Sequence, residues 1–182
     1  MEKIVNAQRV VASAQEKRDL AESVLIRLCA NWESFVDRHL VGCVNRDHSK
    51  LSDFLGVSVP KNPSWDLCHA LVFCDSYRDF PSFGALKGFT KKLLPDESNP
   101  FLNISGAHTK KIDEVYAIRN YLSHYSARAR RSLKRVYKST YQMDRFLEPG
   151  QFMLAYKSKR LWLYFEAFES ASNDMKTWYE NA

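Results

Sequence analysis

One short stretch of the chain places an arginine and a histidine five residues apart, with an asparagine next to the arginine. These residues are Arg119, Asn120 and His124. A guanidinium makes strong, charge-assisted hydrogen bonds to phosphate and carboxylate groups. An imidazole exchanges protons near neutral pH, which suits it to general acid or base catalysis. Held close together, such side chains can bind an anion and move a proton beside it.

A helix expected at residues 107–126 would position these side chains. On a helical wheel of about 100° per residue, the apolar side is formed by Val115, Ile118, Tyr121, Leu122 and Tyr125. The polar side is formed by Asp113, Tyr116, Arg119, Asn120, Ser123 and His124. Asn120 and His124 are four residues apart, a spacing at which helical side chains touch. Arg119 borders the apolar side, where a charge is costly unless it is paired.

Spacing alone favours a plainer interpretation, a solvated helix face. The residues around the arginine and the histidine give a reason to consider a functional site instead. Residues 114–125 read EVYAIRNYLSHY, which resembles the R-x4-6-H motif of the HEPN superfamily (higher eukaryote and prokaryote nucleotide-binding domains). In that family a polar residue, often Asn, follows the Arg, and the preceding turns are apolar with an acidic residue. Arg119, Asn120 and His124 match these positions. The NWESF stretch at residues 31–35 is similar to the early helix of bacterial HEPN ribonuclease families, including RiboL-PSP-HEPN.

The resemblance implies a metal-independent endoribonuclease. His124 would take the proton of a ribose 2′-OH or give one to the leaving oxygen, and Arg119 would stabilise charge on the phosphate. Asn120 would orient His124 or contact the phosphate. DNA, which lacks the 2′-OH, would not be cut. The resemblance also implies a homodimer with a shared cleft, and a toxin or anti-phage defence effector held in check by an inhibitor or antitoxin.

Glu33 is a further candidate for the site. On its own helix it falls within the apolar arc, beside Ile26, Cys29 and Leu40. A carboxylate in such a place needs a partner, and Arg119 is the one we expect, with Glu33 positioning the guanidinium. The alternative is a partly exposed glutamate at the edge of the arc.

Basic residues gather directly after the motif. They are Arg128, Arg130, Arg131, Lys134, Arg135 and Lys138, in a chain with a formal net charge of +6. Positive charge beside a phosphodiester-cutting site raises affinity for RNA without reading its sequence. Tyr137 and Tyr141 lie among these residues and can stack on bases. The alternative is an ordinary solvated segment, and the pattern does not predict its secondary structure.

We expect no metal and no cofactor. The cysteines (Cys29, Cys43, Cys68 and Cys74) form no CxxC pair, and no histidine stands beside them at zinc-ligand spacing. Cys29 and Cys68 lie among apolar residues, and His39 lies on the apolar side of its helix. No phosphate-cradling Gly-rich loop is present. The N-terminal residues do not resemble a signal peptide and no apolar run reaches the ~20 residues of a membrane span, so we expect a cytoplasmic protein with reduced cysteines.

The fold predicted around these residues is all-α. The chain has 182 residues with 45% apolar and 26% charged, which suits one globular domain over residues 1–182. Few glycines and prolines occur, and the apolar spacing predicts helices at about 3–45, 64–74, 86–94, 107–126 and 159–180, with a break near Arg18. Loops are expected at 45–64, with a short turn of helix as an alternative within it, and at 96–106. A turn is expected at Pro149 and a short extended piece at 151–156. The prediction is an HEPN-like bundle of about five helices.

Other classes of protein remain open. One is a non-catalytic HEPN module that binds RNA or nucleotide, or a helical protein-interaction domain. Such members often lose the Arg or the His, and both are present here. Another is a helical protein unrelated to the family, which would leave Arg119 and His124 on an exposed face away from any cleft.

Overall fold

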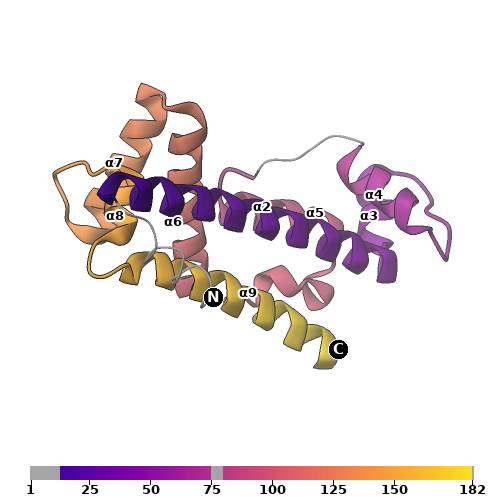
Figure 1. Cartoon of the computed structure of the whole chain (residues 1–182). Coiled ribbons are helices and arrows are strands. Elements are labelled where there is room, and N and C mark those ends of the chain that lie inside the picture. Colours follow the sequence, from indigo (N-terminus) through magenta and orange to yellow (C-terminus); the bar gives the residue numbers. More distant parts are fainter. Residues whose placement is uncertain (1–12, 75–79, 182) are drawn as a thin grey trace. The chain divides into compact units, whose positions relative to one another are not determined.

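The computed structural model describes residues 13–74 and 80–181, and every regular element in these ranges is helical (Figure 1). The α-helices are α2 (Ala14–Arg46), α3 (Ser49–Leu55), α4 (Trp65–Phe73), α5 (Phe83–Leu93), α6 (Gly106–His124), α7 (Ala127–Tyr141), α8 (Pro149–Leu154) and α9 (Lys159–Asn181). Two short 3-10 turns, η1 (Asp96–Ser98) and η2 (Pro100–Leu102), lie between α5 and α6. The predicted all-α class is confirmed, and likeness to the HEPN fold stays a prediction.

Eight α-helices in the described ranges replace the five or so that were predicted. Helix α3 lies inside the predicted loop at 45–64, and α7 covers the basic stretch whose structure was not predicted. The extended piece expected at 151–156 was wrong, because α8 begins there at Pro149, whose fixed φ suits the first position of a helix. Helix α2 also continues past Arg18 without the expected break. The part of the first predicted helix before residue 13 lies outside the described residues.

Serine side chains fix the start of several helices. Ser64, predicted as an N-cap, accepts a hydrogen bond from the backbone N–H of Leu67 at 3.2 Å. Ser126 accepts one from Ala129 at the start of α7, at 3.1 Å. These caps satisfy backbone donors that have no partner within the helix.

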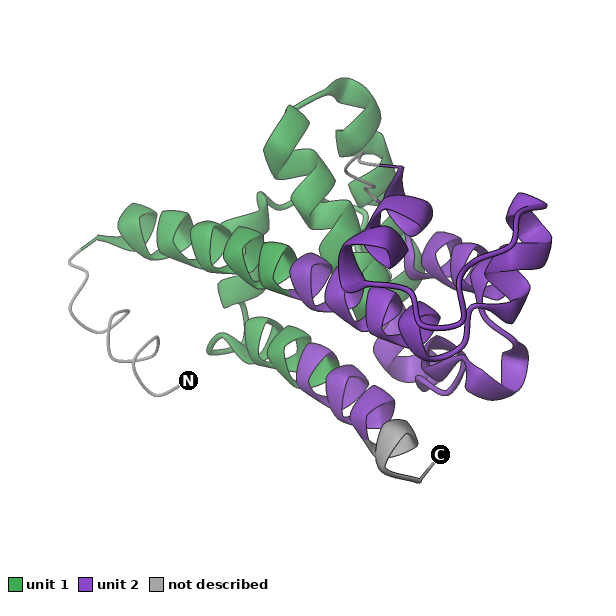
Figure 2. Ribbon diagram, turned by 90° about the vertical axis from the view of Figure 1, so that its right-hand side faces the viewer, with its two compact units in different colours: residues 1–31, 111–167 green, residues 32–110, 168–182 purple. Residues whose placement is uncertain are grey.

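Residue contacts divide the chain into two compact units (Figure 2). Unit 1 contains residues 1–31 and 111–167, and unit 2 contains residues 32–110 and 168–182. The division passes through α2, α6 and α9, and the change of colour along α2 and α9 is visible in Figure 2. The single domain expected over residues 1–182 stays a prediction.

An aromatic cluster forms the centre of unit 1. The Tyr137 ring stacks on Phe152 with centroids 4.1 Å apart, and Phe146 lies 5.5 Å from Tyr121 and 5.7 Å from Tyr137. These rings join α6, α7, the following loop and α8. Helix α8 also contacts the first half of α2, where the N–H of Gly150 donates to the Glu22 carboxylate at 2.8 Å.

The core of unit 2 is built around Trp32. Its ring lies 5.2 Å from Phe168 in α9 and 6.5 Å from Phe83 in α5. About two turns further along α2, the His39 ring packs against Phe35 and Phe101, at 5.2 and 6.0 Å. These contacts tie α2, α5, η2 and the end of α9 together.

Candidate functional site

Helices α6 and α7 form an antiparallel hairpin that positions the predicted motif (Figure 1). At its open end, Lys111 and Glu114 of α6 hydrogen-bond to the hydroxyl of Tyr141 at the end of α7, at 2.8 and 2.6 Å. At its closed end, α6 stops at His124, and Tyr125 adopts the left-handed conformation with φ 43°. That conformation costs a non-glycine residue roughly 1–2 kcal/mol, and it turns the chain sharply into α7. His124 therefore stands at the tip of the hairpin.

The motif residues differ in burial along the last turns of α6. Arg119 and Asn120 are half-buried, whereas Ser123 and His124 are exposed. The guanidinium carbon of Arg119 lies 5.8 Å from the centre of the Tyr116 ring, within the range of a cation–π contact. Arg119 thus lies at an apolar border, as its place on the wheel predicted, and His124 is open to solvent.

The predicted apolar side of this helix is confirmed for Val115, Ile118, Tyr121 and Leu122, which are all buried. It was wrong for Tyr125, which is 65% exposed, because the left-handed turn places it after the end of the helix. Tyr116, assigned to the polar side, is buried with 1% exposure. The buried arc of α6 is therefore wider than the wheel indicated.

Glu33 lies in the second half of α2, in unit 2, and is half-buried. Asp37, four residues later, shares its surroundings: burial, and then the negative charge of Glu33, raises the pKa of Asp37. Arg119 belongs to unit 1. The pairing of Glu33 with Arg119 stays a prediction.

Helix α7 presents the predicted basic residues on one exposed face. Leu133 and Tyr137 are fully buried, whereas the helix exposes Arg128, Arg130, Arg131, Lys134, Arg135 and Lys138. Arg131, Lys134, Arg135 and Lys138 line a shallow hollow of about 500 Å³. Lys138 pairs with Asp144 at 3.3 Å and Arg130 lies over the Phe146 ring at 4.3 Å. This basic face follows His124 directly in the chain.

Stacking of bases on Tyr137 was wrong, because its ring is fully buried against Phe152 and burial raises the pKa of its hydroxyl. Tyr141 is half-buried, and its ring lies 5.1 Å from Phe152. Its hydroxyl is committed to Lys111 and Glu114. The cations of α7 are therefore more exposed than its tyrosines Tyr137 and Tyr141.

Glu114, which is 4% exposed in α6, was not among the residues predicted from the sequence. Its carboxylate accepts hydrogen bonds from Lys111 at 3.0 Å, Tyr141 at 2.6 Å and Tyr164 at 3.2 Å. Burial, and the Glu114 carboxylate after it, raises the pKa of both tyrosines, so they remain donors. This network ties α6 to α7 and α9 and fixes the hairpin that carries the motif.

Within residues 13–74 and 80–181, no three His, Cys, Asp or Glu side chains are grouped so as to hold a metal ion. No helix in the same ranges is both long and apolar enough to cross a membrane. Comparison of the chain with protein-family models, with curated proteins and with solved structures finds no match. Function must therefore be inferred from the residues themselves.

Proposed function

We propose that this protein is a metal-independent endoribonuclease of the HEPN type. The observation that carries the proposal is the arrangement at the tip of the α6–α7 hairpin. Arg119, Asn120 and His124 end α6, and the exposed cations of α7 follow directly. The N-terminus of α7 adds a partial positive charge near His124, which favours a phosphate there.

The proposed reaction is an attack of a ribose 2′-OH on the adjacent phosphorus. The imidazole of His124 takes the 2′-OH proton as the new P–O bond forms, and the P–O5′ bond breaks as the 5′ oxygen takes a proton from water. Arg119 binds the non-bridging oxygens, where negative charge builds up. Asn120, one turn before His124, orients the imidazole or contacts the phosphate. The products are a 2′,3′-cyclic phosphate and a 5′-hydroxyl.

The spacing of the motif favours a site shared by two copies of the chain. Five residues along a helix correspond to a rotation of about 140° and a rise of about 7.5 Å. Arg119 and His124 of one chain therefore lie near opposite edges of the polar side of α6. In a homodimer with the tips of the hairpins adjacent, the arginine of one copy and the histidine of the other can face the same phosphate. The setting that the HEPN resemblance suggests is a toxin or defence effector with an inhibitory partner.

The second candidate is an RNA-binding module without catalysis, which the exposed face of α7 favours. Electrostatic binding needs only the cations, whereas cleavage also needs Arg119 and His124. The two candidates differ in whether RNA is cut or merely bound.

A cleavage assay on a short RNA in the presence of EDTA tests the reaction. We expect cutting that persists in EDTA, leaves 2′,3′-cyclic phosphate ends, and disappears when the same oligonucleotide carries 2′-O-methyl groups. Cutting that requires a divalent ion, or that proceeds on the 2′-O-methyl substrate, would contradict the mechanism. Tight binding of RNA without any cleavage would favour the binding module.

A further inference from the structure

Arg160, in the first turn of α9, is a buried cation without a carboxylate partner in the described ranges. It is 8% exposed. Its Nη1 donates to the carbonyl oxygen of Phe152 at 3.0 Å, and its Nη2 lies 3.9 Å from the sulfur of Met143, a weak acceptor. Burying a charge costs several kcal/mol, and for that reason buried charges are normally paired. The positive charge of Arg160 is not balanced in this way.

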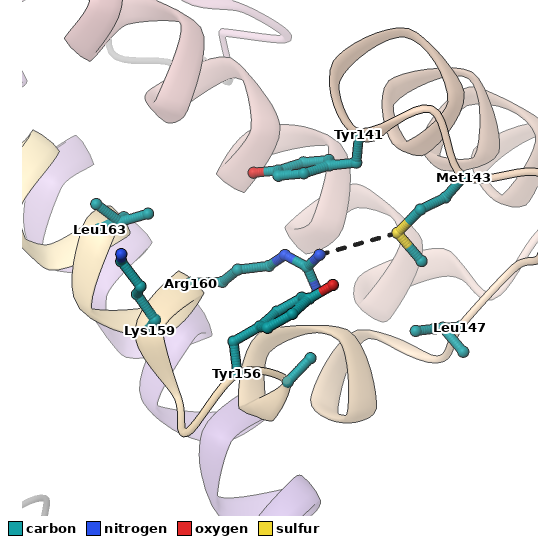
Figure 3. A pocket seen from close by; sticks show the side chains of 8 residues that line it. Tyr141, Met143, Leu147, Tyr156, Lys159, Arg160 and Leu163 are labelled. Carbon is teal, nitrogen blue, oxygen red and sulfur yellow. Dashed lines mark hydrogen bonds between the residues drawn. The ribbon is translucent and has the colours of Figure 1, made fainter.

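Aromatic rings hold the Arg160 guanidinium in place. Its central carbon lies 4.1 Å from the ring centre of Phe152, 4.8 Å from Tyr141 and 5.0 Å from Tyr156. Figure 3 shows the guanidinium between the rings of Tyr141 and Tyr156. Such contacts offset part of the cost of burial. A guanidinium has five N–H donors, and the bonds to Phe152 and Met143 use two of them. Three N–H donors therefore remain for an anion.

The guanidinium borders a pocket of about 600 Å³ within unit 1. Leu147, Ala155 and Leu163 supply apolar walls, and Lys159 adds a second cation. A volume of this size, apolar walls and a few convergent polar groups are typical of small-molecule sites, which span roughly 300–1,000 Å³. The pocket therefore has room for an apolar body as well as an anionic group.

The N-terminus of α9 adds to the positive potential of this pocket. Lys159 and Arg160 occupy the first turn of α9, which contains no acidic residue. The N-terminal end of a helix carries about half a positive charge and is stabilised by anions, not by cations. Two cations at this end are unfavourable by themselves, and a bound dianion would interact well with all three charges.

Tyr156, one of the residues that line the pocket, begins a strained turn. Tyr156, Lys157 and Ser158 have φ values of 54°, 57° and 64°, the left-handed region in three successive non-glycine residues. Each costs roughly 1–2 kcal/mol, and strain of this kind gathers at functional sites. The turn places the ring of Tyr156, which is 76% exposed, beside the guanidinium.

We propose that this pocket binds a small phosphate monoester that carries a ring. The phosphate pairs with the edge of Arg160 and with Lys159, and the ring lies against the apolar walls and Tyr156. Two cations and a helix N-terminus match the double charge of a phosphate monoester better than the single charge of a carboxylate. The site is distinct from the proposed cleavage site, since it uses none of Arg119, Asn120 and His124.

Calorimetric titration of the full chain tests this site with four probes: phenyl phosphate, adenosine 5′-monophosphate, inorganic phosphate and benzoate. We expect the two ring-bearing phosphates to bind with a Kd of about 1 mM or below, and inorganic phosphate and benzoate to bind at least about tenfold more weakly. Failure of both ring-bearing phosphates to bind would overturn the proposal. Equal binding of inorganic phosphate would overturn the role of the apolar walls, and equal binding of benzoate would overturn the assignment to phosphate.

Variants of the pocket separate binding from folding. We expect Arg160→Met, which keeps the packing and removes the charge, to raise the Kd for phenyl phosphate about 10- to 100-fold without lowering the Tm. Lys159→Gln should raise the Kd for phenyl phosphate severalfold. Lys157 is a neighbouring exposed lysine that does not line the pocket, and Lys157→Gln should leave this Kd unchanged. Unchanged binding in Arg160→Met, or an equal loss in both lysine variants, would overturn the proposal. RNA cleavage by Arg160→Met is expected to persist, so the two proposals can fail separately.

Discussion

Arg119 and His124 differ in their surroundings, and the difference suits two separate tasks. The Arg119 side chain is half-buried and lies over the Tyr116 ring, so its guanidinium is held in a limited range of positions. A guanidinium held in this way loses less conformational entropy when it binds a phosphate. His124 is exposed at the end of α6, where it can exchange protons with a bound RNA and with water. In our proposal the first residue binds and the second transfers protons.

We expect His39 in unit 2 to make the stability of the protein depend on pH. Burial lowers the pKa of His39 from 6.5 to about 4. The unfolded chain therefore takes up this proton at a higher pH than the folded chain, and the free energy of unfolding falls as the pH drops from 6.5 towards 4. Because the ring is only partly buried, solvent reduces the effect, and we expect a loss of about 1 kcal/mol between pH 7 and pH 5. Urea unfolding at both pH values measures it.

The control for this prediction is His39→Phe, which keeps a ring beside Phe35 and Phe101. The other histidines contribute equally to both proteins, so the difference between them isolates His39. Equal losses of stability in the wild type and in His39→Phe between pH 7 and pH 5 would show that His39 is not responsible.

At the scale of elements, Gly150 allows α8 to lie directly against α2. A Cβ atom at this position would lie 2.7 Å from Cβ and 2.8 Å from the carbonyl oxygen of Arg18. We expect Gly150→Ala to lower the free energy of unfolding by about 1–3 kcal/mol, since the backbone of α2 must shift. Gly88→Ala in α5 is the matched control, because nothing lies within 4 Å of its Cβ. Gly88→Ala should stabilise the protein by up to about 1 kcal/mol. Equal effects of the two substitutions would contradict the claim that the contact between α8 and α2 requires a glycine at position 150.

The exposed face of α7 predicts how RNA binding depends on salt. We expect the double variant Arg131→Gln, Arg135→Gln to weaken RNA binding similarly for all sequences. It should also lower the slope of log Kd against log salt by about 1 for each phosphate that the variant no longer neutralises. Fluorescence anisotropy over a range of salt concentrations measures both effects. The double variant Lys61→Gln, Lys91→Gln removes two exposed lysines outside α7 and serves as the control, and an equal effect of the two pairs would exclude α7 as the binding surface.

Long elements with clear apolar spacing could be predicted from the sequence, and short or highly charged ones could not. The starts of α4 and α9 and most of α6 lie close to their predicted positions. In α7 the buried positions Leu133 and Tyr137 are four residues apart, but they stand alone among six cations. Helix α8 is only six residues long, and it buries the neighbouring residues Phe152 and Met153. Neither a helical nor an extended spacing of apolar residues can be recognised in so short a segment.

The candidate site was predictable only where its residues lie on one helix. Arg119, Asn120 and His124 belong to α6, and their order along the sequence fixes their relation. The hydrogen-bond network of Glu114 depends on Tyr141 and Tyr164, which are 27 and 50 residues away in the chain. Arg160 likewise depends on rings from α7 and α8 and on the turn before α9. Folding brings these partners together, and no local pattern indicates them.

At the scale of the whole molecule, the proposed shared site predicts complementation between inactive variants. Arg119→Ala and His124→Ala each remove one half of every site. After subunit exchange, half of the dimers are mixed, and each mixed dimer has one of its two sites intact. We expect the mixture to regain roughly a quarter of the wild-type cleavage rate. A mixture no more active than its components would place each site within a single chain.

The most direct test of the central claim is the rate of RNA cleavage in EDTA by the wild type and by His124→Ala. We expect this substitution to lower the rate about 10²- to 10⁴-fold, with an unchanged Tm because His124 is exposed. Substitution of His69, an exposed histidine of α4, by alanine should leave the rate unchanged. Cleavage by folded His124→Ala at the wild-type rate would contradict the claim that α6 carries the catalytic site.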